Sequence, residues 1–462
     1  MLSIYIFSGV PVAFFSESCY NVEEFPYRIH LDRKGARVMP EIMIGNGIRY
    51  TEIHDPKFRS CLLTIQLHIP RSPESAPVHA LLPDLLTASS AAFPSVSAMT
   101  MQLESLYAAD FLAKLSLCGD TAVLDFTASW LDDAYAMNGE PVTEPVLRLV
   151  TDALLHPNAE NGAFCEPEFR ICKQNLLDDI DCEQNDKRSY AIRQAAALTF
   201  SGEPAAIPAH GTRPEAERIT PALAFSVWQN ILRTAEIEIA AVTPAPKPQI
   251  AAILTESFSS LPRQPYPIRF DAPSPVRPQP RIETEIMPVG QTKLVLTYKY
   301  RQIRREVLLM LCSILGWIAD SLLFTNLRER SGLCYYCMLS CESFKHTLFI
   351  DIGIDAVDLE TVQNAAAAQI HALQSGDFTD DMMQKAVLHY AFQAAAASDT
   401  ISDLAMQQIL RLRRNDPRTP QEIADAMKQV TRSEIAEAAK QLVPDTVYIL
   451  RAEQEEAGDD EI

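Results

Sequence analysis

The order of expected strands and helices occurs twice along this chain of 462 residues, and that repeat constrains the fold more than any other feature. Each half begins with strand, continues through two helices and a strand pair, and ends with further helices and a last strand. The first set is expected at Ile48–Ile53, Ser60–Ile69, Pro77–Ser89, Ala98–Ala109, Phe111–Leu117, Ala122–Trp130, 143–155, 166–187, 188–200, 220–234 and Glu236–Val242. The second set is expected at Gln291–Tyr300, Arg304–Leu315, Ser321–Arg330, Leu333–Ser340, Thr347–Ile354, 358–374, 379–413, two short helices from Thr419 and Thr431, and Thr446–Arg451. Two copies of one order predict a duplicated α+β fold built from two α/β sandwich domains.

A proline-rich stretch separates the two sets. Prolines crowd between Pro244 and Pro280 and resist both helices and central strands, although Gln249–Ser260 could form one helix. We therefore expect a first domain over 43–243, a linker over 244–280 and a second domain over 281–452. Residues 1–42 are expected to be a disordered extension, and 453–462 an acidic, solvated tail.

The charge of the chain excludes some classes of partner. A net charge of −20 and a pI near 4.9 argue against nucleic acid and against an anionic membrane surface, since both need clustered Lys and Arg. The apolar start, Met1–Phe15, lacks a basic region and is too short to span a bilayer; a weak signal peptide is the alternative to an extension. Without another candidate span, we expect a cytoplasmic protein.

The segment from Ser321 to Cys337 carries the first candidate site. Asp320 or Ser321 can cap a helix that Gly332 ends in a left-handed conformation, after which the chain becomes a strand. This places Arg328 in the last helical turn and Tyr335 at the start of the strand. A guanidinium and a phenol can both donate hydrogen bonds to a carbonyl oxygen or an oxyanion. The alternative is structural: an Arg that favours the helix dipole and a Tyr that packs in a strand.

The run Leu327-Arg-Glu-Arg-Ser-Gly-Leu-Cys-Tyr335 resembles a motif in the second domain of pitrilysin- and insulinase-like zinc peptidases. The resemblance implies domains of the processing-peptidase type. It also implies that Arg328 and Tyr335 hold the substrate backbone. Active members bind zinc through His-x-x-Glu-His on a first-domain helix, with a later glutamate as third ligand; two His at i and i+4 share one helix face.

The zinc residues of that family are missing here. The matching helix reads Val78-His-Ala-Leu-Leu-Pro-Asp-Leu-Leu-Thr-Ala-Ser-Ser90 and puts Ala80, Pro83 and Asp84 at the three motif positions, with Asp179 near the third ligand. His79 is one residue, or about 100°, out of register, and we expect it to be a surface or capping histidine. No two of the nine histidines form a local chelate, and Cys334, Cys337 and Cys341 lack a second Cys pair. We expect no metal on this chain.

The sequence also lacks the motifs of other enzyme classes. Within the peptidase family, the chain most resembles a zinc-less subunit branch that is linked to elongation factor P modification. No phosphate-binding loop or nucleophile elbow is present. The narrower resemblance lies in Leu103–Asp110, Gln184–Ala191, Gly211 before Glu215, and Asp445–Leu450. It implies a heterodimer with a zinc-bearing homologue, to which this chain lends Arg328 and Tyr335 for a peptide or protein substrate. The alternative is a scaffold that holds a protein in the same clamshell cavity and cleaves nothing.

Overall fold

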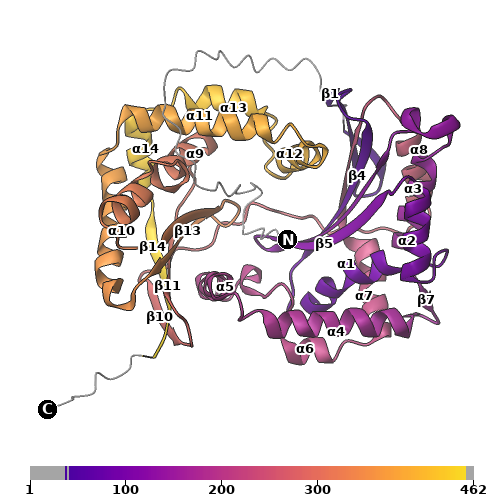
Figure 1. Ribbon diagram of the computed structural model, residues 1–462, viewed down its shortest axis with the longest axis horizontal. Coiled ribbons are helices and arrows are strands. Elements are labelled where there is room, and N and C mark those ends of the chain that lie inside the picture. Colours follow the sequence, from indigo (N-terminus) through magenta and orange to yellow (C-terminus); the bar gives the residue numbers. More distant parts are fainter. Residues whose placement is uncertain (1–36, 39–40, 454–462) are drawn as a thin grey trace.

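The computed structural model describes residues 37–38 and 41–453, which fold around two mixed sheets with helices packed on them (Figure 1). The α+β class and the duplicated architecture predicted from the sequence are confirmed. Each sheet has a central strand that is buried on both faces, because β4 (Ser60–Pro70) and β13 (Thr347–Ile354) expose almost none of their residues.

The first sheet has seven strands in the order β1-β3-β9-β4-β6-β5, with β2 paired to β3. Helix α1 packs on β5 and β6, and a separate small hairpin pairs β7 with β8. The strands are β1 (Arg37–Val38), β2 (Ile42–Gly45), β3 (Ile48–His54), β4, β5 (Asp110–Cys118), β6 (Thr121–Leu131), β7 (Ala159–Glu160), β8 (Ala163–Phe164) and β9 (Glu236–Thr243). The helices are α1 (Ala76–Ala88), α2 (Val96–Ser105), α3 (Thr143–Leu155), α4 (Glu166–Cys182), α5 (Lys187–Thr199), α6 (Arg213–Glu217), α7 (Pro221–Thr234) and α8 (Pro248–Phe258).

The second sheet has five strands in the order β10-β14-β11-β13-β12. The strands are β10 (Arg281–Ile286), β11 (Thr292–Lys299), β12 (Tyr336–Glu342), β13 and β14 (Val443–Arg451). The helices are α9 (Arg305–Cys312), α10 (Leu359–Ser375), α11 (Asp380–Ala396), α12 (Ile401–Arg413), α13 (Pro420–Met427) and α14 (Arg432–Ala439), with π-helical turns at Ser313–Trp317 and Phe324–Arg330. Thr419 and Thr431 form the predicted capping boxes of α13 and α14.

Two expectations about the chain's course are corrected. The long helix expected at 379–413 is two helices, because the chain turns at Ser398–Asp399 and Thr400 caps α12 by accepting a hydrogen bond from the amide of Asp403 (3.1 Å). The fold also begins before residue 43, since β1 and the start of β2 pair with β3. The rest of the expected N-terminal extension, and nearly all of the acidic tail, lie outside the described residues.

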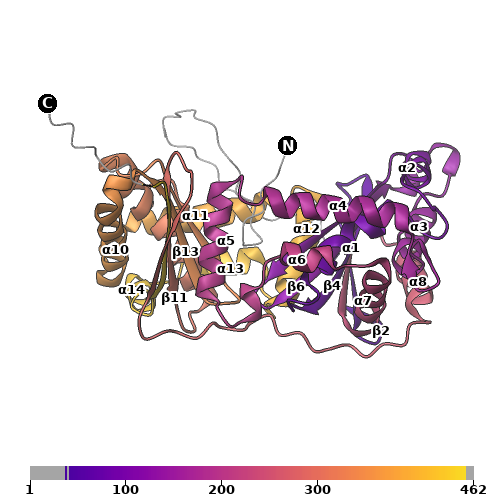
Figure 2. The same cartoon turned by 90° about the horizontal axis from the view of Figure 1, so that it is seen from below.

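The two halves exchange a helix. Helix α5 comes from the first half but packs on the second sheet, where Tyr190 and Phe200 join a cluster with Phe349 and Tyr448. Helix α12 comes from the second half but packs on the first sheet, where Ile409 contacts a cluster that includes Val242. Figure 1 shows α12 beside β4, and Figure 2 shows α5 beside β11 and β13. The predicted domain division at 244–280 remains a prediction. Helices α5 and α12 each pack against the half on the other side of it.

Buried polar contacts reinforce this exchange. Arg188 on α5 forms an ion pair with Asp351 on β13 (2.5 Å), and Lys345 in the β12–β13 turn pairs with Asp120 in the β5–β6 turn (3.0 Å). The Lys299 ammonium donates to the backbone oxygen of Thr199 at the end of α5 (3.0 Å). Such charge-assisted bonds away from water hold the geometry of the two halves more firmly than surface pairs do. Among the described residues, no helix is long and apolar enough to cross a lipid bilayer.

Candidate functional site

The helix that carries Arg328 is wound more widely than the sequence predicts. Residues Phe324–Arg330 form a π-helix, a form often found at functional sites. Gly332 ends it with a φ of 60°, as predicted, and the amide of Leu333 donates to the backbone oxygen of Leu327 (2.9 Å). The predicted side-chain cap is wrong: Asp320 instead accepts from Lys385 (2.7 Å), and the Ser321 hydroxyl is buried without a partner among the described residues.

Tyr335 lies on the surface at the start of the outer strand of the second sheet. Its backbone amide donates to the oxygen of Gly353 (2.9 Å), which fixes it to β13, while 57% of the residue is exposed. Its hydroxyl donates to the carboxylate of Asp355 (3.1 Å), and this hydrogen bond to an anion raises the pKa of Tyr335. More than half of Tyr335 is therefore open to solvent, unlike a core residue.

Arg328 is also exposed, four residues before the glycine turn. Its guanidinium lies over the ring of Phe324, 5.1 Å from the ring centroid, a cation–π contact within one helical turn. Its positive charge also acts on Cys334, where it opposes the rise in the thiol pKa that burial causes. Arg328 and Tyr335 thus lie at the two ends of one exposed turn, and both retain polar atoms at the surface.

Asp355 is a site residue that the sequence did not reveal. It follows β13, and the register that pairs Tyr336 with Gly353 brings it next to Tyr335. Asp355 and Tyr335 are 20 positions apart in the sequence, so only knowledge of the β12–β13 register could have predicted their contact. The contact means that the Tyr335 proton is directed at a carboxylate in the free chain.

The expected zinc positions lie on α1 as the sequence predicts, but they do not fit a metal ion. Ala80 is half-buried and Pro83 is buried, and neither side chain has a ligand atom. Asp84 and Asp179 are close enough to interact: the pKa of Asp84 is raised first by partial burial and then by the charge of Asp179. Within the described ranges, no three His, Cys, Asp or Glu side chains form a group that could hold a metal.

His79 is buried, which corrects its expected place on the surface. Only 4% of it is exposed, and burial lowers its pKa to about 4. It lines a small cavity with Leu115, Leu117 and Arg71, so it faces the hairpin of the first sheet. One residue of helical register, about 100°, separates this direction from that of Ala80. His79 is therefore a neutral core residue.

Two edge strands accompany these residues, each paired on one side only among the described residues. Strand β5 is the last strand of the first sheet, and β12 is the last strand of the second. Leu112 on β5 is 66% exposed and Met338 on β12 is 37% exposed. An edge strand presents unpaired backbone groups that an extended peptide can join. Strand β12 follows Tyr335 directly, so the exposed tyrosine lies at the start of such an edge strand.

Comparison with known proteins identifies the group. Residues 218–388 match the family model described as the peptidase M16 inactive domain. The chain is 24% identical over 416 residues to the probable inactive metalloprotease YmfF of Bacillus subtilis (strain 168), covering 88% of this chain and 96% of that one. The chain is similar to the inactive branch of the M16 peptidases. The resemblance to a zinc-less branch of the insulinase-like peptidases is thereby confirmed.

Several solved structures share the fold of this chain. A conserved protein from Enterococcus faecalis V583 superposes with a TM-score of 0.83 at 22% identity, covering 91% of this chain and 99% of that one. A peptidase M16 inactive domain from Pseudomonas fluorescens gives 0.74 at 16% identity, with 90% and 98% coverage. A protease from Helicobacter pylori gives 0.75 at 12% identity, with 90% and 100% coverage. At these identities the likeness concerns the fold alone.

Proposed function

We propose that this chain is the metal-free subunit of a two-chain zinc endopeptidase in the cytoplasm. Its zinc-bearing homologue supplies the metal, and this chain supplies Arg328 and Tyr335 as hydrogen-bond donors to the substrate backbone. The observation that carries the proposal is the contrast between the two sites. Ala80 and Pro83 offer no ligand atom, whereas Tyr335 is exposed next to the edge strand β12.

The proposed donors act on the oxygen of the bond that is cut. Negative charge develops on that oxygen as water adds to the carbonyl, and donors already in place stabilise it more than they stabilise the substrate. Strand β12 could align an extended peptide by backbone hydrogen bonds so that its carbonyl reaches Tyr335. The hydrogen bond from the Tyr335 hydroxyl to Asp355 must then break when the substrate binds, so that the hydroxyl can donate to the substrate instead.

The same contact with Asp355 favours a second candidate. Because the Tyr335 hydroxyl already donates to a carboxylate, it is not free to donate in the isolated chain. A non-catalytic scaffold that holds a peptide or protein, such as elongation factor P, needs no such donor. We infer the elongation factor link only from the resemblance to the branch linked to that modification.

Reconstitution separates the two candidates. The chain is mixed with the zinc-bearing M16 homologue from the same cell and followed by sedimentation, peptide cleavage and elemental analysis. The proposal expects a 1:1 complex, zinc in the homologue only, and cleavage that is faster for the pair than for either chain alone. A complex with elongation factor P but none with the homologue would support the scaffold instead.

A further inference from the structure

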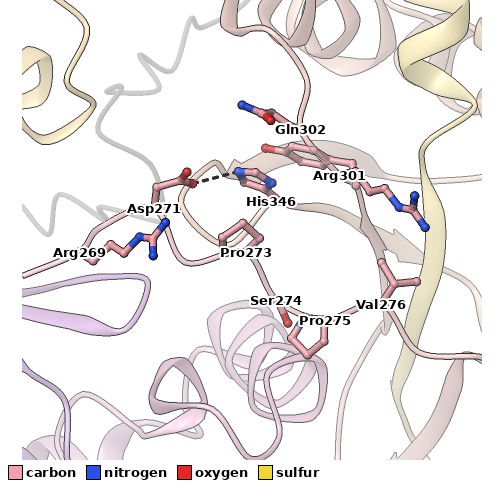
Figure 3. A pocket seen from close by; sticks show the side chains of 10 residues that line it. Arg269, Asp271, Pro273, Ser274, Pro275, Val276, Arg301, Gln302 and His346 are labelled. Atoms are coloured by element: carbon pink, nitrogen blue, oxygen red, sulfur yellow. Dashed lines mark hydrogen bonds and ion pairs between the residues drawn. The ribbon is translucent and has the colours of Figure 1, made fainter.

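A groove of about 620 Å³ lies outside the Arg328–Tyr335 site, in the connection between the two halves. Its walls come from three pieces of chain: residues 269–276 of the proline-rich stretch, residues 300–302 after β11, and His346 in the β12–β13 turn. Figure 3 shows Arg269 and Arg301 on opposite sides of His346, with Pro273 and Pro275 below it. The volume is within the range of ligand sites in proteins.

The walls are held in place although the 269–276 segment has no helix or strand. The amides of Ala272 and Ser274 donate to the oxygens of Phe344 (3.0 Å) and Lys345 (3.1 Å). The Lys299 ammonium donates to the oxygen of Pro275 (2.9 Å). The segment is thus attached along its length to the second half. A ligand would meet a preformed surface and would not have to order it, which lowers the entropic cost of binding.

The charge of the groove has the opposite sign to that of the chain. Neither the Arg269 nor the Arg301 side chain has a hydrogen bond or ion pair within the part of the chain that the structure describes. The one carboxylate in the lining, Asp271, is engaged by Nε2 of His346 (3.0 Å). Two guanidiniums therefore remain available in a protein whose net charge is −20.

His346 has an unusual backbone and an unmatched nitrogen. It is a non-glycine residue with a φ of 51°, and its ring is stacked flat on Tyr300 at 5.1 Å. Its Nδ1 is buried without a hydrogen-bond partner among the described residues. Strained backbones and unpaired buried polar atoms concentrate at functional sites.

We propose that this groove binds an acidic peptide segment. Two of its carboxylates pair with Arg269 and Arg301 at the two sides, and the residues between them lie on Pro273 and Pro275. A guanidinium binds a carboxylate through parallel hydrogen bonds, and the proline rings offer apolar contact but no competing donor. Because Arg269 and Arg301 lie on opposite sides of His346 (Figure 3), a ligand with two separated charges suits the groove better than a single phosphate. The inference is independent of the proposed peptidase role.

Fluorescence anisotropy with the full chain tests the proposal. The probe is a labelled Ser-Glu-Leu-Gly-Glu-Ser peptide, and its match has Gln in place of both Glu. We expect the acidic peptide to bind at least tenfold more tightly, and its binding to weaken as salt rises because the charges are partly exposed. Arg269→Gln and Arg301→Gln should each weaken binding about three- to tenfold. Both side chains are exposed, so the thermal midpoints should not change.

Arg218→Gln is the matched control, because Arg218 is an exposed arginine outside the groove. Equal loss of binding in this control would mean general electrostatic attraction and would overturn the proposal. Equal binding of the Gln peptide would do the same. Binding of inorganic tripolyphosphate but not of the acidic peptide would contradict the peptide assignment and make the groove a phosphate site.

Discussion

A buried glutamate between the exchanged helix α12 and the first sheet should make stability depend on pH. Glu238 on β9 is 1% exposed, and neither of its carboxylate oxygens has a hydrogen-bond partner among the described residues. His68 lies 4.0 Å away, and Arg413 on α12 bonds Gln66 and approaches His68 Nε2 at 3.4 Å. The charged groups that act on Glu238 are Arg49, Arg413, Glu41 and Glu236.

Burial raises the pKa of Glu238 from 4.5 to about 7, and Arg49 and Arg413 limit the rise. Since the folded-state pKa is the higher one, this group's contribution to stability is complete below pH 4.5 and is lost as pH rises through 7. Between pH 5 and pH 8 the loss is about 2.5 kcal/mol, from 1.36 kcal/mol per pKa unit. Glu238→Gln keeps the shape but cannot titrate.

Urea unfolding at several pH values measures the effect. The difference in unfolding free energy, variant minus wild type, should rise by about 2.5 kcal/mol from pH 5 to pH 8. The buried side-chain amide introduced by Glu238→Gln also costs stability, but that cost is the same at every pH and does not alter the expected rise. Glu104→Gln, at an exposed position of α2 and not among the groups that act on Glu238, is the control for net charge. A difference that stays flat across pH would show that Glu238 is hydrated or paired, and would refute the reasoning.

Three further outcomes are expected. Ile409→Ala should destabilise the chain by about 2–5 kcal/mol in urea unfolding, because Ile409 is fully buried between α12 and the first sheet. Leu388→Ala is the control and should change the unfolding free energy little, because Leu388 is 63% exposed. Equal losses of stability in the two variants would contradict the helix exchange. The purified chain should hold no stoichiometric zinc by elemental analysis, since Ala80 and Pro83 cannot ligate, and one tightly held zinc would sink that conclusion. Asp355→Asn should lower the pKa of Tyr335 in an NMR titration, because the carboxylate that raises it is gone; an unchanged pKa would mean that the contact does not persist in solution.

Local pattern was sufficient to predict much of the fold. The alternation of Phe111–Leu117 and Ala122–Trp130 around Gly119 predicted the β5–β6 hairpin, and Gly119 has the left-handed φ of 55° that such a turn favours. The Thr-x-x-Glu boxes located the starts of α13 and α14. These signals depend on neighbours within a few residues, which a sequence shows directly.

Contacts between distant residues could not be predicted in this way. The surfaces that α5 and α12 cover belong to the opposite half, so their amphipathic patterns show a buried face without showing against what. The helical register of His79 ruled out a role as a metal ligand, and the sequence then suggested a surface position. In the structure the β5–β6 hairpin buries it. Asp355 reaches Tyr335 only through the strand register. At the candidate site, Arg328 and Tyr335 keep their predicted places, and their role remains a proposal.

The turnover of the reconstituted pair with Tyr335→Phe tests the central claim most directly. The substitution removes one exposed hydroxyl and leaves the backbone pairing with Gly353 intact. Tyr266→Phe is the control, since Tyr266 is 56% exposed in the connecting segment. We predict that Tyr335→Phe lowers kcat roughly 10- to 1000-fold, with assembly and zinc content unchanged, while Tyr266→Phe has no effect. Normal turnover with Tyr335→Phe would contradict the claim that this chain lends a donor to the composite site.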